Sequence, residues 1–84
     1  MRKNKELLQV FLDNQHLFKT GICGWVMDLY IEGAISFEER MYLLGLIRKN
    51  EPVLTKIGLQ GDGLYYWEKG NIKPRIKWLK KHLR

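Results

Sequence analysis

The sequence contains a single cysteine, two prolines and no long apolar run. Because Cys23 has no second cysteine to pair with, no disulfide can form within the chain, and one thiol is more typical of a reducing cytoplasm than of secretion. No stretch approaches the roughly 20 apolar residues that a membrane-spanning helix requires. The opening MRKNKELLQVF lacks the apolar core and the cleavage site of a signal peptide. We therefore expect a cytoplasmic protein with no membrane partner.

Motifs that carry catalysis or bind a metal are also missing. The strong metal-ligand side chains, Cys23, His16 and His82, do not have the spacing of a zinc site. Cys23 lies in a stretch expected to form an amphipathic helix, which favours packing over a nucleophilic role. The GDG at 61–63 is too short for a phosphate-binding loop, and no Walker or dinucleotide motif follows it. We expect a non-enzymatic protein without a metal or cofactor.

Acidic residues are absent from the end of the chain. The chain has fifteen basic and nine acidic residues, for a formal net charge of +6. Residues 69–84 hold seven of the basic side chains and no acid, whereas residues 1–68 hold eight basic and nine acidic side chains. The excess positive charge therefore belongs to one terminal segment, a pattern that favours an acidic or polyanionic partner.

The remaining composition is that of a small globular protein, with 45% hydrophobic and 12% aromatic residues. A chain of 84 residues can enclose one core, so we expect a single domain over residues 1–84. Apolar residues at helical spacing predict helices over about 4–18, 20–31 and 36–50, and a fourth from Lys73 or Pro74 onward. Asn4 and Thr20 are the expected N-caps of the first two.

The third predicted helix has the clearest boundary signals. Ser36 and Glu39 form the Ser-x-x-Glu pattern of a capping box. Gly33, just before it, is suited to a left-handed C-terminal cap of the second predicted helix. Pro52 disfavours helical geometry at Glu51 and so ends the third helix. The expected core side of this helix consists of Phe37, Met41, Leu44 and Ile47, extended by Leu43 and Leu46.

Residues 53–71 are the least regular part of the sequence, with four glycines between 58 and 70. They are compatible with an ordered loop or with a small hairpin across residues 60–63. The predicted fold is mainly α, a compact bundle of about four helices with a loop or small β-hairpin before the C-terminal helix.

The final helix separates into three sides at about 100° per residue. The first side is apolar and is expected to dock on the core: Ile72, Ile76, Leu79 and Leu83. The second side is broad and basic: Lys73, Lys77, Lys80, Lys81 and Arg84. The third is a mixed flank: Arg75, Trp78 and His82.

The basic side and the mixed flank each have a structural and a functional interpretation. The lysines either keep an exposed helix hydrated and complement its dipole, or contact phosphate or an acidic protein surface. Trp78 either covers the aromatic segment 65–67 with its own ring buried, or anchors a partner. Strand-like alternation in that segment places Tyr65 and Trp67 on one side and Tyr66 on the other.

Three stretches, GICGWVMDLYIEGAISFEERMYLLGLI, YYWEKG and KPRIKWLKKHL, together resemble small accessory proteins of tailed bacteriophages. The resemblance covers about residues 21–83. It rests on a Gly-x-Cys helix, a capped helix that opens with Ser and Glu, an aromatic YW loop and a final PR..WL helix. The matching positions are Gly21, Cys23, Pro74, Arg75, Trp78 and Leu79. The resemblance implies an early phage protein in the cytoplasm of the infected bacterium, where it binds and blocks a host defence or replication factor.

The leading functional hypothesis is thus a non-enzymatic binding protein that inhibits a host bacterial protein. Its expected contact residues are Tyr66, Trp67, Arg75, Trp78 and His82. The alternative is a nucleic-acid-binding module that contacts phosphates through Lys73, Lys77, Lys80, Lys81 and Arg84. A binder of signalling nucleotides, which combines those cations with stacking aromatics, is a third hypothesis. A homodimer is also compatible with so small a core.

Overall fold

The computed structural model describes residues 1–18, 21–56 and 73–83 of the chain. These residues form five α-helices and one 3-10 turn, and none of them is in a strand. The elements are α1 (Asn4–Asp13), η1 (Gln15–Leu17), α2 (Ile22–Ile31), α3 (Phe37–Lys49), α4 (Glu51–Lys56) and α5 (Lys73–His82). The predicted mainly α-helical, compact fold is confirmed, with principal extents of 29 × 22 × 21 Å.

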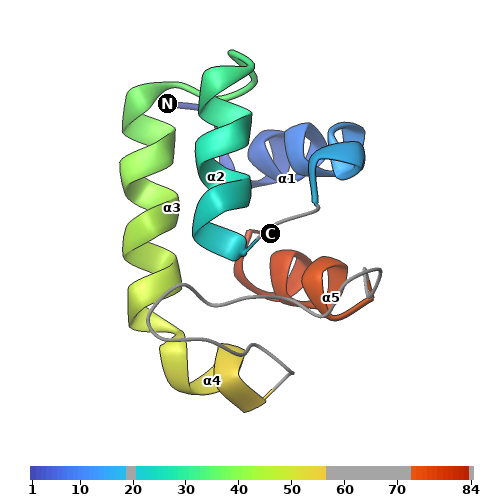
Figure 1. The fold of residues 1–84 in the computed structure, drawn as a ribbon, viewed down its shortest axis with the longest axis vertical. Helices are drawn as coiled ribbons and strands as arrows, with labels where there is room; N and C mark the ends of the chain where they lie inside the picture. Colours follow the sequence, from blue (N-terminus) through green and yellow to red (C-terminus); the bar gives the residue numbers. More distant parts are fainter. Residues whose placement is uncertain (19–20, 57–72, 84) are drawn as a thin grey trace.

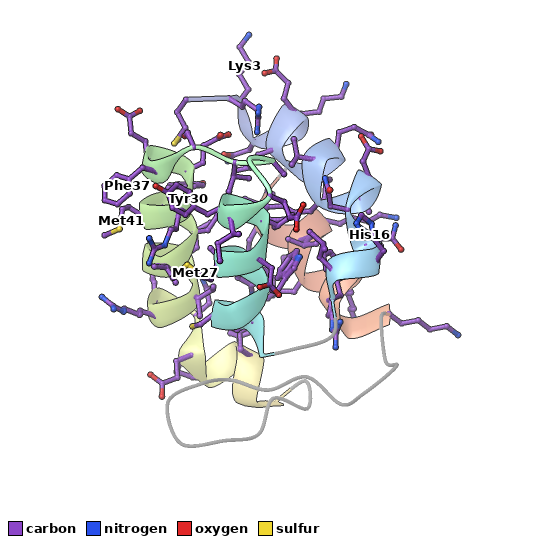
Figure 2. The ribbon with its side chains drawn as sticks, turned by 45° about the horizontal axis from the view of Figure 1, so that its top comes forward. Lys3, His16, Met27, Tyr30, Phe37 and Met41 are labelled. Carbon is purple, nitrogen blue, oxygen red and sulfur yellow. The ribbon has the colours of Figure 1, made fainter. Side chains whose placement is uncertain are left out.

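The helices are arranged around a pair formed by α2 and α3. Figure 1 shows these two helices side by side and nearly antiparallel, with α1 and α5 lying on one side of α2. The short α4 continues from the lower end of α3, and α5 packs against α1. Among the described residues, no further helix covers the outer face of the α2–α3 pair (Figures 1 and 2).

The first helix is shorter than predicted, because Asn14 interrupts it. The Asn14 side-chain amide donates a hydrogen bond of 2.8 Å to the carbonyl oxygen of Val10, and the chain continues as η1. An asparagine side chain that competes for the carbonyl groups of its own helix favours such an end. The prediction of Asn4 as N-cap is wrong: Lys3 occupies that position, and Asn4 accepts a 3.1 Å hydrogen bond from the Tyr42 hydroxyl.

The end of α2 confirms the predicted left-handed glycine. Gly33 has φ 77°, a conformation that costs other residues a steric clash. Its N–H donates to the carbonyl of Tyr30 at 3.0 Å, and the N–H of Ala34 donates to that of Leu29 at 2.9 Å. These two bonds make a Schellman motif. At the other end, α2 follows Gly21, and the expected cap Thr20 lies outside the described residues.

The predicted capping box at the start of α3 is confirmed. The N–H of Glu39 donates to Ser36 Oγ at 3.1 Å, and the N–H of Ser36 donates to Glu39 Oε1 at 2.9 Å. The Glu39 carboxylate also forms a 3.2 Å ion pair with Arg2. The same Arg2 guanidinium donates to the carbonyl of Ala34 at 2.6 Å, so the start of the chain is tied to the α2–α3 turn.

The predicted core side of α3 is partly wrong. Leu43 and Ile47 are buried, but Phe37 is 57% exposed and Met41 is 50% exposed. Apolar residues occupy more than one side of this helix, so their spacing is compatible with two orientations. The buried Glu39, held by the capping box and by Arg2, belongs to the orientation that turns Phe37 and Met41 outward.

The predicted end of the third helix before Pro52 is confirmed, but the expected non-helical geometry at Glu51 is wrong. The helix α3 ends at Lys49 with Asn50 as its C-cap, and α4 begins at Glu51. Pro52 stands in the first turn of α4, where the missing N–H has no helical partner to lose. The expectation of a loop or hairpin over residues 53–71 is wrong for residues 53–56, which belong to α4, and residues 57–71 lie outside the described residues.

An aromatic cluster forms the centre of the core. The ring of Trp25 on α2 lies 4.6 Å from that of Phe11 on α1 and 4.1 Å from that of Phe18 after η1, measured between centroids. The helix α5 starts at Lys73, as predicted, and buries Leu79 while Leu83 is buried just beyond its end. Ile76 is half-buried against the same cluster, and Ile72 lies outside the described residues.

Candidate binding surfaces

Arg75 is a structural residue in this fold. It is 2% exposed, and its guanidinium donates a hydrogen bond to the carbonyl oxygen of Phe18. The guanidinium carbon also lies 5.8 Å from the centroid of the Phe18 ring, within the range of a cation–π contact. Burial lowers the pKa of Arg75 from its usual value. Arg75 therefore fastens α5 to the turn after η1, and its burial leaves little of the side chain for the partner contact that was predicted.

Trp78 is likewise inside the protein, with 3% exposure. Its indole ring lies 4.9 Å from the ring of the half-buried His82, between centroids. The ring is buried, as the structural interpretation of Trp78 expects, but the segment 65–67 that it was expected to cover lies outside the described residues. Its burial leaves little of the ring for the alternative role as a partner anchor. The sequence placed Trp78 off the apolar stripe of α5, but α1 and α4 border this helix on different sides, so the core reaches further round it. The other predicted contacts, Tyr66 and Trp67, lie outside the described residues.

The predicted basic side of α5 is exposed to solvent. The exposed lysines are Lys73, Lys77, Lys80 and Lys81. Arg84, the fifth member of the predicted set, lies outside the described residues. Within the described part of the chain, none of these four lysines forms an ion pair, so their charges are available to an anionic partner.

A second surface joins α2 and α3 and is apolar. We call it the α2–α3 surface, and define it by four exposed side chains, Met27, Ile31, Phe37 and Met41. Met27 and Ile31 are four residues apart on α2, as Phe37 and Met41 are on α3, so each pair shares a helix face. Figure 2 shows Met27, Phe37 and Met41 on the open side of the two helices, with Tyr30 among them.

Tyr30 links the two halves of the α2–α3 surface. Its ring meets that of Phe37 edge to face, with 6.3 Å between centroids. The guanidinium carbon of Arg40 lies 5.2 Å from the Tyr30 centroid, within cation–π range. Arg48 is exposed seven residues after Met41, and therefore on the same side of α3. The apolar surface is thus bordered on α3 by two arginines.

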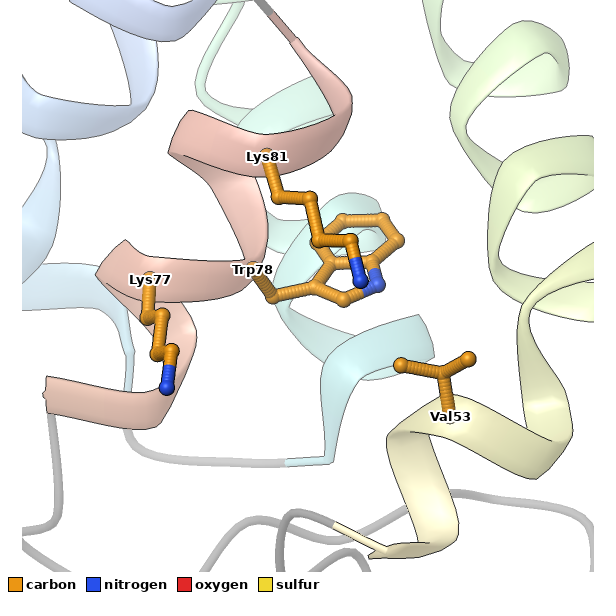
Figure 3. A pocket seen from close by; sticks show the side chains of 4 residues that line it. All are labelled: Val53, Lys77, Trp78 and Lys81. Atoms are coloured by element: carbon orange, nitrogen blue, oxygen red, sulfur yellow. The ribbon is translucent and has the colours of Figure 1, made fainter.

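A small pocket lies between α4 and α5. It has a volume of about 160 Å³ and is lined by Val53, Lys77, Trp78 and Lys81 (Figure 3). Burial, and to a lesser degree the charge of Lys81, lowers the pKa of the neighbouring His82. The pocket therefore combines an apolar wall with a locally positive potential.

Cys23 lies half-buried on α2 and packs against the core. Burial raises the pKa of its thiol, and the nearby charge of Arg48 opposes that shift only in part. A protonated thiol is a weak nucleophile, because the thiolate is the reactive form.

The sequence analysis did not predict the α2–α3 surface, although the positions of its two α2 residues indicated it. Met27 and Ile31 fall outside the buried stripe of α2, which Ile22, Trp25, Val26 and Leu29 form. Two large apolar side chains off the core stripe of one helix indicate an exposed apolar patch. The two α3 residues of the surface, Phe37 and Met41, gave no such indication, because they were assigned to the core.

Comparisons with known protein families, curated proteins and solved structures find no match to this chain. No helix in the described residues combines the length and the apolar character that crossing a membrane requires.

Proposed function

We propose that this chain is a non-enzymatic binding protein that engages and inhibits a host bacterial protein, in keeping with its resemblance to bacteriophage accessory proteins. We further propose that it docks through the α2–α3 surface, and not through Arg75 and Trp78. The observation that supports this choice is the exposure of four large apolar side chains on two adjacent helices.

The apolar composition of the surface favours a protein partner. Aromatic residues, methionine and arginine are enriched in protein interfaces, and this surface offers Phe37, Met41 and Arg40 within two turns of α3. The edge-to-face contact with Tyr30 holds the Phe37 ring in place, which reduces the side-chain entropy lost on binding.

The charge at the border of the surface favours an acidic partner segment. Arg40 and Arg48 flank the apolar residues of α3, and the chain as a whole carries a net charge of +6. We propose that the occupant is an amphipathic helix with apolar side chains toward Met27 and Phe37 and carboxylates toward the two arginines. Packing of an amphipathic helix through its apolar face is a common mode of protein recognition, and opposite charge accelerates the encounter.

The test begins with capture of a partner from bacterial lysate and continues with the purified partner. Binding is measured by titration calorimetry for the natural chain and for an Ile31→Lys, Met41→Lys double variant. Two interface side chains of this kind contribute roughly 1–2 kcal/mol each, so we expect the double variant to bind about 100-fold more weakly. A Gln9→Lys, Gln15→Lys variant adds the same charge at exposed positions of α1 and η1 and is expected to bind normally.

Two results would contradict the proposal. Unchanged affinity in the double variant would remove the α2–α3 surface from the interface. Self-association of the natural chain in sedimentation equilibrium, abolished by the double variant, would instead assign the surface to a second copy of the protein.

A nucleic-acid-binding function is the second candidate, and the exposure of Lys73, Lys77, Lys80 and Lys81 favours it. Four phosphate contacts would make the affinity for duplex DNA fall with salt at a logarithmic slope of about −3.6. We expect a variant with glutamine at all four positions to lose most of that slope. If no duplex or single strand is bound at about 50 mM salt, this function is excluded, because phosphate contacts are strongest at low salt.

A further inference from the structure

The pocket between α4 and α5 has a lining that matches one class of small molecule. The described residues that line it come from α4 and from two successive turns of α5: Val53, Lys77, Trp78 and Lys81. Figure 3 shows the Lys81 side chain lying across the indole of Trp78, with Val53 on the facing helix, while Lys77 extends from the preceding turn of α5. Both lysines border the pocket, and Lys81 lies nearer to its apolar walls.

Among the described lining residues, the polar side-chain atoms are all hydrogen-bond donors. An indole nitrogen and a lysine ammonium can donate but not accept. Trp78 is 3% exposed, and among the described residues its Nε1 has no hydrogen-bond acceptor. A buried donor without a partner is destabilising, and a hydrogen bond to an oxygen of a bound ligand would remove that cost. The lining thus requires an acceptor, and two ammonium groups favour one that is negatively charged.

The size and the walls of the pocket limit the rest of the ligand. A cavity of about 150 Å³ with apolar walls holds a molecule the size of benzene. The volume here is about 160 Å³, with Val53 and the indole as its apolar walls. A single aromatic ring with one anionic substituent therefore fits the space, the charge and the donors together.

We infer that this pocket binds a small aromatic oxyanion, a ring that carries a carboxylate or a phosphate. Its ring contacts Val53 and Trp78, and its oxygens accept hydrogen bonds from Trp78 Nε1 and from the ammonium groups of Lys77 and Lys81. This site is independent of the α2–α3 surface, which lies on other helices.

The test follows the indole N–H resonance of Trp78 by NMR during titration with benzoate, and then with phenyl phosphate. The resonance is assigned by its loss in a Trp78→Phe variant. Benzamide serves as the probe control, because it has nearly the same shape without the charge. We expect benzoate or phenyl phosphate to shift the resonance in a saturable manner with a Kd on the order of 1 mM, and benzamide to leave it unchanged.

Two lysine variants distinguish specific binding in the pocket from general electrostatic attraction to the helix. A Lys77→Gln, Lys81→Gln variant is expected to raise the Kd at least about tenfold, because charge-assisted hydrogen bonds are lost. A Lys73→Gln, Lys80→Gln variant removes the same charge from the same helix outside the pocket and is expected to bind normally. The inference is overturned by equal shifts with benzoate and benzamide, by equal weakening in both lysine variants, or by the absence of a saturable shift with either anion.

Discussion

The guanidinium of Arg75 lies against Phe18, 57 positions earlier in the chain, both over its ring and in a hydrogen bond to its carbonyl oxygen. This one side chain joins the last helix to the turn that follows η1. Because the contact is buried, removal of the guanidinium leaves a carbonyl group without its donor inside the protein.

An Arg75→Met variant is therefore expected to lower the free energy of unfolding by about 2–3 kcal/mol, because the buried hydrogen bond and the cation–π contact are both lost. Urea denaturation followed by circular dichroism measures the change. Lys77→Gln, at an exposed position of the same helix, is expected to change stability by less than about 0.5 kcal/mol. Equal stability of Arg75→Met and the natural chain would show that the contact contributes nothing.

The capping box at the start of α3 is expected to contribute measurably to stability. Ser36→Ala removes the acceptor for the N–H of Glu39 and is expected to cost about 1 kcal/mol. Thermal denaturation detects this loss as a shift of several degrees in Tm. Glu38→Gln alters the same first turn without a capping bond and is expected to cost only a few tenths of a kcal/mol. A smaller effect for Ser36→Ala than for Glu38→Gln would contradict the prediction.

Alanine substitutions at Gly33 and Gly45 are expected to change the free energy of unfolding in opposite directions. Gly33 has φ 77°, so Gly33→Ala is expected to destabilise the protein by about 1–2 kcal/mol. Gly45 lies within α3, and a Cβ there would meet no atom within 4 Å. Gly45→Ala is expected to stabilise the protein by about 0.4–1 kcal/mol, because it restricts the unfolded chain and favours the helix. Chemical denaturation of both variants tests the pair, and the same sign for both would be the contrary result.

The orientation of α3 makes a further prediction about stability. Leu43→Ala removes a buried side chain and is expected to cost about 2–5 kcal/mol. Met41→Ala, two residues earlier on the exposed side, is expected to cost less than about 0.5 kcal/mol. If the two variants unfold at the same urea concentration, the helix is not turned as described.

His82 is expected to make stability depend on pH between about 5 and 7. Its pKa in the folded protein is lowered by burial and by Lys81, so the unfolded chain takes up a proton more readily. The stability that neutral His82 contributes is fully present above the unfolded pKa of about 6.5, and it is lost as pH falls through the folded pKa. A His82→Gln variant is expected to lose less stability than the natural chain when pH falls from 7 to 5. His16→Gln serves as the control at an exposed position, and parallel pH curves for the natural chain and His82→Gln would refute the prediction.

The sequence by itself determined the features that depend on neighbouring residues. The capping box of Ser36 and Glu39, the left-handed Gly33, the break near Pro52 and the start of α5 are all local, because each depends on hydrogen bonds or steric limits within a few residues. The exposure of the four lysines was predictable for a similar reason, since ammonium groups are rarely buried without a partner.

The tertiary structure alone decided which apolar and aromatic side chains are inside. Phe37 and Met41 have the spacing of a buried stripe and are exposed, whereas Arg75 and Trp78 lie off the stripe of α5 and are buried. Periodicity describes the faces of one helix, but it does not say how many neighbours that helix has or from which directions they pack. In the described part of the chain, α3 has an outer side that no helix covers, whereas α5 is bordered by α1 and α4. The candidate interface therefore moved from the last helix to the α2–α3 surface.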